Sequence, residues 1–352
     1  MGTHCARSIA QLLRNRKWLR TNSDGLKQFS LPQPSTQPTA RLSGMTDRRL
    51  LAEKAANIWS SFQRNVEPLA RGAQIVAAPD VTQDDIGGLA SAKEEILTYA
   101  YAQTSPEVYG RWGTFPPSAM LMIGRRGSGK SLLAEYLAAQ TETAFVRVDV
   151  PRMVLDVIHG APKIGELVQG WSAALEEMPP VTIFFDELEF TRAHEMGERG
   201  AELPTGPIMD FLFELIDRSL SIEGCLVIAS TSQSGTLPEA FLSPGRFERI
   251  VEVNPLFPED IEEALRIHAL AAESRAERSI FGELDWSAIV NNTREPSIGD
   301  WIRILHAVLR RKARLDAAGE SPAQVTQSDF SAEISRFRQA NTRIRTDGGN
   351  YL

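Results

Sequence analysis

The sequence has few cysteines, no long apolar run and no excess of basic residues, and each absence excludes a class of protein. Two cysteines among 352 residues cannot build a disulfide scaffold or a cysteine-rich zinc site, and they fit a reducing compartment. No apolar run approaches the roughly 18 residues that a membrane-spanning helix needs. The formal charge of −7 disfavours nucleic acid as the main partner, because contacts to phosphates need basic surface.

The charge is unevenly distributed along the chain. Residues 1–44 contain seven Lys or Arg and one acidic residue, so this leader carries +6 and the rest of the chain carries −13. A basic, acid-poor leader is typical of a cleaved organelle-targeting peptide, and a disordered arm or a misassigned start explains it as well. We therefore predict a cytoplasmic protein, or a mitochondrial-matrix protein if the leader is a targeting peptide.

Apolar patterning predicts an α/β domain between two less regular ends. Residues 1–45 form a disordered leader, 46–79 a helical arm or linker, and 341–352 a flexible tail. Within 80–256, β-rich runs alternate with helical segments, which predicts a parallel sheet sandwiched by helices. Helical patterns alone remain in 257–340, which predicts a small all-α lid domain. The predicted strands are Ala119–Ile123, Ala144–Val150, Val181–Phe185, Cys225–Ser230 and Ile250–Val253.

The helical arm has apolar residues near heptad spacing, at Leu51, Ala55, Ile58 and Phe62. This spacing fits a short coiled coil between subunits, and it fits equally a helix that packs on its own domain. Pro68 is expected to end the helix, because proline lacks the N–H that a helix interior needs.

The strongest motif is Gly124-Arg-Arg-Gly-Ser-Gly-Lys130-Ser131, which matches the phosphate-loop pattern GxxxxGK[ST] between a predicted strand and a predicted helix. Such a loop turns backbone N–H groups toward phosphate oxygens, and the following helix N-terminus attracts anions. Lys130 is expected to reach the β- and γ-phosphates of ATP, and Ser131 to ligate Mg²⁺. The predicted nucleotide-binding residues here are Gly124, Arg125, Arg126, Gly127, Ser128, Gly129, Lys130, Ser131 and Leu132.

Two carboxylates, Asp186 and Glu187, follow the apolar run Val181–Phe185. A buried strand that ends in two acidic residues is costly unless they serve an ion or a reaction. Asp186 is predicted to hold Mg²⁺ together with Ser131, as a nucleotide-binding and metal residue. Glu187 is predicted to polarise the attacking water, which distinguishes a hydrolase from a protein that only binds nucleotide.

Two arginines, Arg246 and Arg249, stand three residues apart after a Pro-Gly turn. Arginine suits the charge that develops on a γ-phosphate, because its planar fork of donors stays protonated. Such an arginine is commonly supplied in trans by a neighbouring subunit. Surface salt bridges are the alternative interpretation.

Three further segments make the whole pattern resemble an AAA-family ATPase of the AAA+ superfamily, of the proteasomal-ATPase, segregase and membrane-protease-ATPase kind. They are Asp84–Leu89, Ser105–Pro117 and Leu242–Arg249, beside the Walker A loop and the Walker B strand. The resemblance implies a P-loop NTPase fold and a homo-oligomeric ring, usually a hexamer, with ATP, Mg²⁺ and arginine fingers at subunit interfaces. It also implies that Ile86, Gly87 and Gly299 bind the nucleotide.

The sequence departs from the family pattern at three places. Arg125-Arg126 replaces the usual Pro-Pro of the loop, which leaves the phosphate-binding backbone amides in place. Ser232 stands where the family has an asparagine sensor, so we expect slower hydrolysis with Ser232 in the catalytic role. The segment Asp156–Gly160, expected to be the central-pore loop, has Ile158 and His159 instead of an aromatic residue, which weakens its grip on an unfolded chain.

The C-terminal Tyr351-Leu352 resembles tails by which proteasome-activating ATPases dock into a proteolytic chamber. Several copies of a short tail on one ring bind at high effective concentration. A frayed end with an incidental tyrosine is the alternative.

We predict an ATP-hydrolysing ring that remodels or unfolds a protein substrate or an adaptor-bound partner, in the manner of a chaperone. The alternative is an ATP-dependent scaffold or regulatory switch with little translocation activity, which Ser232 and the missing pore aromatic favour. A DNA-handling ATPase is a third possibility, disfavoured by the acidic charge that follows the leader.

Overall fold

The computed structural model describes residues 38–160, 163–189, 205–233, 235, 237–243, 245–247, 249–294 and 296–347. The chain divides into two units, Met1–Ser43 and Gly44–Leu352, and the features below belong to the second, apart from residues 38–43 at the start of the first described helix. Residues 1–37, 161–162, 190–204 and 348–352 lie outside the described residues, and the predictions made for 1–37 and for Tyr351-Leu352 therefore stay predictions. The prediction of a disordered leader is wrong at 38–45, which begin a helix.

A six-stranded sheet, in the order β1-β3-β4-β5-β2-β6, is the centre of the α/β part. All neighbours run parallel except the edge pair of β1 and β3. The strands are β1 (Ala73–Val76), β2 (Ala119–Ile123), β3 (Ala144–Asp149), β4 (Val181–Asp186), β5 (Cys225–Thr231) and β6 (Arg249–Glu252). The strands that follow β2 in the chain lie on both sides of it, with β3, β4 and β5 on one side and β6 on the other. Ligands of open α/β sheets bind at such a switch point in the strand order.

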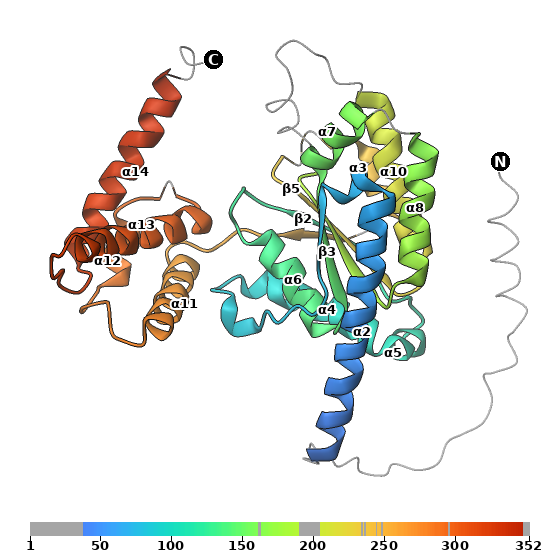
Figure 1. Ribbon diagram of the computed structural model, residues 1–352, viewed down its shortest axis with the longest axis horizontal. Coiled ribbons are helices and arrows are strands. Elements are labelled where there is room, and N and C mark those ends of the chain that lie inside the picture. Colours follow the sequence, from blue (N-terminus) through green and yellow to red (C-terminus); the bar gives the residue numbers. More distant parts are fainter. Residues whose placement is uncertain are drawn as a thin grey trace, which may run out of the picture. The chain divides into compact units, whose positions relative to one another are not determined.

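Side chains alternate along each inner strand between two apolar layers. Ile183 and Phe185 of β4 join one layer, whereas Phe184 between them joins the other and stacks on Phe145 at 6.1 Å. This is the burial expected of strands covered on both faces, and it confirms the predicted parallel sheet sandwiched by helices. Helices α4 (Ala90–Thr104) and α6 (Lys130–Gln140) cover one face; α2 (Pro38–Asn65), α7 (Val150–Gly160), α8 (Ile164–Glu177) and α10 (Thr205–Ser221) cover the other (Figure 1).

Helix α2 packs on its own domain, which decides between the two interpretations of the arm. Trp59 and Phe62 are buried and contact Trp171 of α8 edge-on, at 6.4 and 5.7 Å between ring centroids. The helix begins at Pro38, earlier than predicted, because proline suits a first helical turn. It ends at Asn65, and Pro68 stands instead in the first turn of the short helix α3 (Glu67–Ala70). The prediction of a helical arm through residue 79 is wrong at β1, which pairs with β3.

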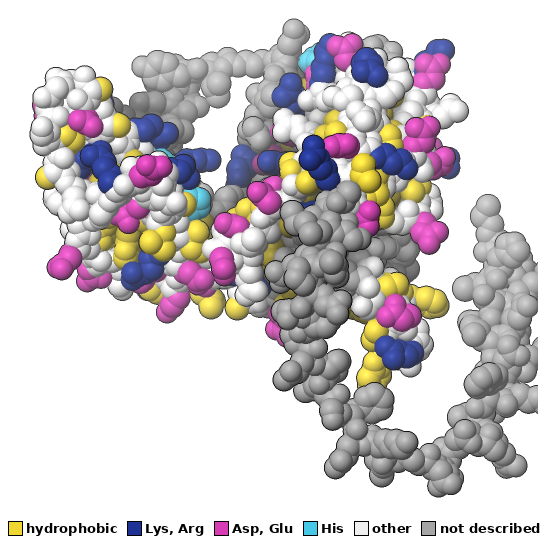
Figure 2. All heavy atoms as spheres, turned by 60° about the horizontal axis from the view of Figure 1, so that its bottom comes forward, with side chains coloured by type: hydrophobic (Ala, Val, Ile, Leu, Met, Phe, Trp, Pro, Cys, Tyr) yellow, Lys and Arg dark blue, Asp and Glu magenta, His cyan; other side chains and the backbone are white. Residues whose placement is uncertain are grey.

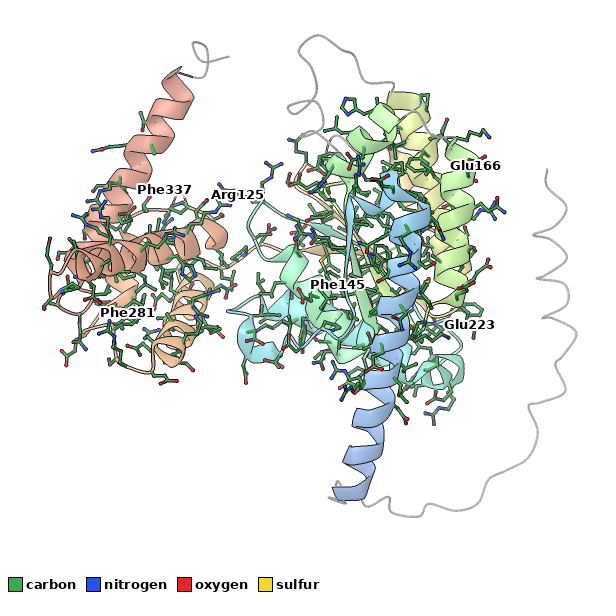
Figure 3. All side chains as sticks on the ribbon, in the orientation of Figure 1. Arg125, Phe145, Glu166, Glu223, Phe281 and Phe337 are labelled. Atoms are coloured by element: carbon green, nitrogen blue, oxygen red, sulfur yellow. The ribbon has the colours of Figure 1, made fainter. Side chains whose placement is uncertain are left out.

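Four helices form the lid-like part: α11 (Glu259–Ala276), α12 (Trp286–Asn291), α13 (Ile298–Ala317) and α14 (Gln327–Asp347). They enclose a separate apolar core around Trp301 and Phe330, and Phe281 packs against it (Figure 3). Ser297 and Asp300 form a reciprocal capping box that fixes the start of α13. Helix α14 continues past Phe337 into the predicted flexible tail, because the first helix-breaking glycines come at Gly348 and Gly349.

The described surface is mixed in charge, and Cys225, the one thiol among the described residues, is buried in the core. Basic and acidic side chains intersperse on the described part of the face in Figure 2, with hydrophobic groups between them. Burial in β5 raises the pKa of the Cys225 thiol to about 12, as befits a small core residue. Among the helices of the described residues, none combines the length and apolar character that crossing a membrane requires.

Asp260, at the start of α11, connects the α/β part to the lid. Its carboxylate is buried and accepts hydrogen bonds from the backbone N–H groups of Leu89, at 3.0 Å, and Leu256, at 2.8 Å. Gly88 has room for no side chain here, since a Cβ would lie 2.0 Å from the Asp260 carboxyl carbon. One side chain thus ties the segment Asp84–Leu89 to the hinge.

Replacing Asp260 by alanine is expected to lower the free energy of unfolding by about 2–4 kcal/mol, because two buried N–H groups lose a charged acceptor. Urea unfolding followed by tryptophan fluorescence measures this. The neighbouring Glu259 is exposed, so Glu259→Ala is the matched control and should change stability little. Equal stability of the two variants would contradict the role given to Asp260.

Candidate active site

The predicted site residues gather at one edge of the sheet. Strands β2, β5 and β4 are neighbours and parallel, so their carboxyl ends meet there. The phosphate loop follows β2, Ser230 and Ser232 lie at the end of β5, and Asp186 and Glu187 lie at the end of β4. Residues far apart in the sequence therefore form a single polar site.

The phosphate loop is shaped as a backbone cradle. Gly127 and Gly129 have φ of 77° and 107°, which residues with a side chain adopt only with strain. A Cβ at Gly124 would lie 2.4 Å from the carbonyl oxygen of Val253, so the start of the loop also requires glycine. Helix α6 begins directly at Lys130, and its first-turn N–H groups provide the positive end of the helix dipole. This cradle fits the phosphates of a nucleotide.

Lys130 is held inside the loop. Its ammonium is nearly buried and donates to the carbonyl oxygens of Gly124, at 2.7 Å, and Arg125, at 3.0 Å. Burial lowers the pKa of Lys130, while the nearby charges of Asp186, Glu189 and Glu187 oppose that shift. Leu132, two residues on, packs against the apolar layer below the loop and has no polar group for the nucleotide.

Asp186 collects three donors. Ser230 Oγ donates to Oδ1 at 2.6 Å, while Arg147 Nη2 at 2.6 Å and Ser131 Oγ at 3.3 Å donate to Oδ2. A hydroxyl and a carboxylate that converge beside a phosphate cradle are the oxygen ligands that Mg²⁺ takes, with phosphates and water completing its shell. The donor set therefore fits Mg²⁺ on Ser131 and Asp186.

Glu187 has an unusual backbone and a cationic partner. Its φ of 61° lies in the left-handed region, and its N–H donates to Ser230 Oγ at 3.1 Å. Strained conformations of this kind concentrate at functional sites. Arg126 Nε lies 3.0 Å from Glu187 Oε1, and the Glu187 side chain is only 14% exposed. The two acidic residues thus each face an arginine, Arg147 for Asp186 and Arg126 for Glu187.

Ser232 is engaged by a residue that the motif comparison missed. Both its N–H, at 3.0 Å, and its hydroxyl, at 2.7 Å, donate to Glu189 Oε1. Glu189 is buried, and its Oε2 has no hydrogen-bond partner among the described residues. Arg147, Ser230 and Glu189 were all missed, because local sequence pattern does not say which polar side chains of neighbouring strands share an edge. For Ser230 there was one signal, since it stands two residues before Ser232 and side chains two apart in a strand point to the same face.

The lid contributes to the same site through the start of α13. Gly299 N–H donates to the carbonyl oxygen of Gly127 at 3.0 Å, so this predicted residue touches the phosphate loop itself. Ile86 is buried and its carbonyl accepts from Lys93 Nζ at 2.6 Å, while Gly87 packs against Ala264 of α11.

A cavity of about 260 Å³ opens beside this contact, at the hinge. Arg125, labelled in Figure 3, and Ser128 line it from the phosphate loop. Phe257, Ser297 and Ile298 line it from the hinge and lid. The base and sugar of a nucleotide lie next to its phosphates, so they would lie near this cavity. Its walls are partly apolar and partly polar, which suits a base and a sugar.

Arg246 and Arg249 bind acidic partners away from the phosphate loop. Arg246 forms two bonds of 2.7 Å with Asp217 of α10 and stacks 4.4 Å from the Phe213 ring centroid. Arg249 donates through Nε to Glu95 of α4 at 3.0 Å. The chain therefore does not bring these two residues to its own Asp186 and Glu187.

The segment Asp156–Gly160 forms the last turns of α7 and is not a loop. Ile158 packs against the apolar layer under that helix, while His159 is exposed. The apolar spacing of Met153, Val154 and Val157 explains the helix, since all three are buried on one face.

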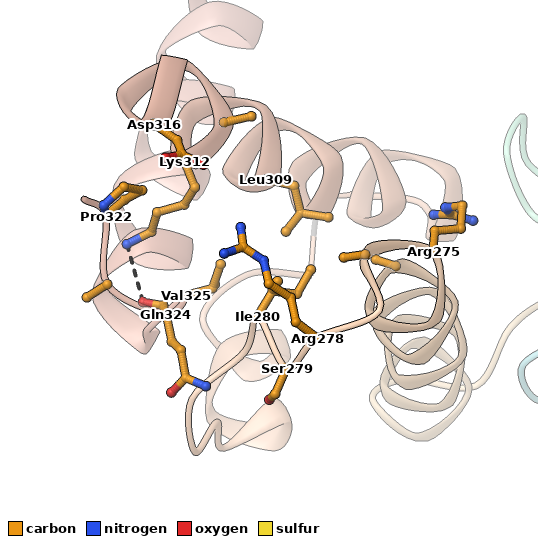
Figure 4. Close-up of a pocket in the computed structure, with 14 residues that line it drawn as sticks. Arg275, Arg278, Ser279, Ile280, Leu309, Lys312, Asp316, Pro322, Gln324 and Val325 are labelled. Carbon is orange, nitrogen blue, oxygen red and sulfur yellow. Dashed lines mark hydrogen bonds between the residues drawn. The ribbon is translucent and has the colours of Figure 1, made fainter. Parts of the chain in front are cut away.

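The lid has a second cavity, of about 410 Å³, shown in Figure 4. Leu309, Ile280 and Val325 form its apolar wall, and Lys312 donates across its rim to the Gln324 carbonyl at 3.3 Å. None of the predicted site residues lines this cavity.

Comparison with known proteins gives consistent similarities. The family described as "ATPase family associated with various cellular activities (AAA)" matches residues 120–255, from β2 to the hinge. Protein CdcH of Halobacterium salinarum is 30% identical over 204 residues, 58% of this chain and 27% of that protein. The proteasome-activating nucleotidase of Pyrococcus horikoshii is 30% identical over 273 residues, 77% of this chain and 64% of the relative. That of Methanothermobacter thermautotrophicus is 33% identical over 297 residues, 82% of this chain and 68% of the relative. The chain thus spans less than two thirds of the length of the first two relatives.

Proposed function

Since the chain belongs to the AAA family of ATPases, we propose that it binds ATP with Mg²⁺ and hydrolyses the γ-phosphate as a homo-oligomeric ring. The single observation that carries this proposal is the convergence of Lys130, Ser131, Asp186 and Glu187 at the carboxyl edge of three neighbouring strands. A protein that only bound nucleotide would need the cradle but not a second carboxylate beside Asp186.

The residues divide the chemistry among them. Backbone N–H groups of 124–130 and the start of α6 hold the phosphates, and Lys130 neutralises their charge. Ser131 and Asp186 would hold Mg²⁺, which withdraws charge from the phosphate oxygens. Glu187 accepts the proton of the attacking water as the bond from the γ-phosphorus to ADP breaks and ADP keeps the electron pair. Ile86, Gly87 and Gly299, at the joint with the lid, hold the nucleotide from the other side.

Arginine fingers complete this site from a neighbouring subunit. Arg246 and Arg249 are bound to Asp217 and Glu95, so a chain alone does not use them at its own Glu187. In a ring, Arg246 and Arg249 of each subunit lie next to the nucleotide site of the following subunit. The family resemblance implies that the ring has six subunits. Because both arginines stay charged and present a planar fork of donors, they suit the γ-phosphate of that subunit.

The ring acts on a protein partner in this proposal. Relatives named proteasome-activating nucleotidases support action together with a proteasome. A protein substrate or adaptor, docking through Tyr351-Leu352 and a cytoplasmic setting are parts of the proposal that go beyond those names. A second candidate, the ATP-dependent scaffold, is favoured by the packing of the partly buried Ile158 against the core, which leaves little apolar surface there to grip an unfolded chain. Stimulation of turnover by an unfolded protein supports the first, and its absence supports the second.

Lys130→Ala tests the proposed function. The variant should bind ATP about 10–100-fold more weakly, because charge-assisted hydrogen bonds to the phosphates are lost. Fluorescent ATP titrated with Mg²⁺ measures this, beside release of inorganic phosphate. Lys54→Ala is the control, since Lys54 is exposed on α2, which packs on the opposite face of the sheet from α6. If the wild-type chain neither binds nor hydrolyses ATP, or Lys130→Ala behaves like the wild type, the proposal is refuted.

A further inference from the structure

Arg126 has a contact that the proposed ATPase mechanism does not use. Its Nε lies 3.0 Å from Oε1 of Glu187, the residue proposed to activate water. The neighbouring Arg125 lines the hinge cavity instead. Two adjacent arginines of one loop therefore face opposite sides of the site.

Two other cations of the site, Lys130 and Arg147, are already bound to different partners. The Lys130 ammonium is bound by two loop carbonyl oxygens, and Arg147 is bound to Asp186 at 2.6 Å. The Arg126 side chain is 55% exposed, so its guanidinium can move by rotation about its own side-chain bonds. It is the cation of the loop best placed to change partners.

Arg126 also lies at the reactive end of the phosphate site. A base that activates water must lie beyond the γ-phosphate, on the side from which water attacks, so a guanidinium bound to Glu187 is at that end as well. The charges of Arg126 and Glu187 both act on the Lys130 ammonium, which is consistent with their closeness to the bound phosphates.

We propose that Arg126 leaves Glu187 and binds the γ-phosphate when ATP is bound. Glu187 can then act on water only when a γ-phosphate is present. This inference rests on the proposed ATPase function. The γ-phosphate carries more charge than one carboxylate and offers several acceptor oxygens, so it competes well for the guanidinium. With ADP bound, or with no nucleotide, Arg126 stays on Glu187. Arg126 is thus a γ-phosphate-binding residue and a positioning residue for Glu187.

The exchange predicts that Arg126 discriminates ATP from ADP. Arg126→Ala should weaken binding of a non-hydrolysable fluorescent ATP analogue about tenfold, the value of one charge-assisted hydrogen bond, and leave ADP affinity within about twofold. Arg125→Ala is the matched control, with the same loss of charge in the same loop, and should change both affinities by the same factor. Arg126→Lys should recover part of the ATP affinity, because it restores the charge without the fork.

A double-mutant cycle tests the exchange itself. Glu187→Gln removes the competitor for Arg126, so it should tighten ATP-analogue binding in the wild-type loop and have no such effect in Arg126→Ala. Equal effects in both loops would overturn the exchange, and so would an unchanged ratio of ATP to ADP affinity in Arg126→Ala. If Lys130→Ala still weakens both nucleotides in that case, the ATPase function stands and only this inference fails.

Discussion

Glu187→Gln is expected to reduce ATP hydrolysis by about 10²–10⁴-fold and to leave ATP bound, because an amide of the same shape cannot accept the proton of the attacking water. The cradle of 124–130, Lys130 and Asp186 is intact in this variant, so binding is retained. A multiple-turnover phosphate-release assay measures the loss, and fluorescent ATP at the same protein concentration measures the binding. Because the proposed arginine fingers bind ATP from the neighbouring subunit, the variant, which keeps its ATP, should also sediment as a stable oligomer.

The matched control makes the same chemical change at the opposite edge of the sheet. Glu223 is exposed and precedes the amino end of β5, far from the site in Figure 3, so Glu223→Gln should hydrolyse ATP like the wild type. Glu187→Gln with undiminished turnover would remove Glu187 from the mechanism. A simultaneous loss of ATP binding would show that its carboxylate holds the cradle together instead.

Arg246→Ala is expected to lower turnover by about 10³-fold, the lower end of the range for arginine fingers, if the guanidinium acts on the neighbouring subunit. The same substitution removes two bonds to Asp217, a hydrogen bond to the Ala240 carbonyl oxygen and the contact with the Phe213 ring, so it should lower the free energy of unfolding by about 1–3 kcal/mol. Loss of activity by a variant that is still folded at the assay temperature would therefore be a loss of catalysis. Arg218→Ala is the control, since Arg218 follows Asp217 on α10 and lines the same surface hollow as Arg246.

Mixing the two inactive variants tests whether Arg246 acts in trans. An Arg246→Ala subunit keeps Glu187, and a Glu187→Gln neighbour keeps Arg246, so adjacent subunits of a mixed ring complete one site. Partial recovery of turnover in the mixture is the expected result. No recovery would mean that Arg246 and Glu187 act on the nucleotide of the same subunit. Normal hydrolysis by Arg246→Ala alone would show that Arg246 is not an arginine finger.

Much of the fold and the core of the site were predictable from local pattern. Every strand predicted in 119–253 exists within a residue or two at its ends, because a fully buried strand is a short apolar run between turn residues. Edge strand β1 was not predicted, since four residues of mixed burial carry little periodic signal and pair only through β3. The helix through Asp156–Gly160 was missed because the motif comparison assigned a loop where the apolar spacing is helical.

The sequence by itself determined the phosphate loop, the carboxylate pair and the family, because the cradle depends on consecutive backbone groups whose spacing the chain fixes directly. Only the tertiary structure decided the partners of those residues: Arg147 on Asp186, Glu189 on Ser232, Arg126 on Glu187 and Asp217 on Arg246. These contacts join side chains from 29 to 61 residues apart, through strand order and helix packing that no local pattern encodes. The sequence thus identifies the proposed catalytic residues, whereas their ion pairs form only in the folded structure.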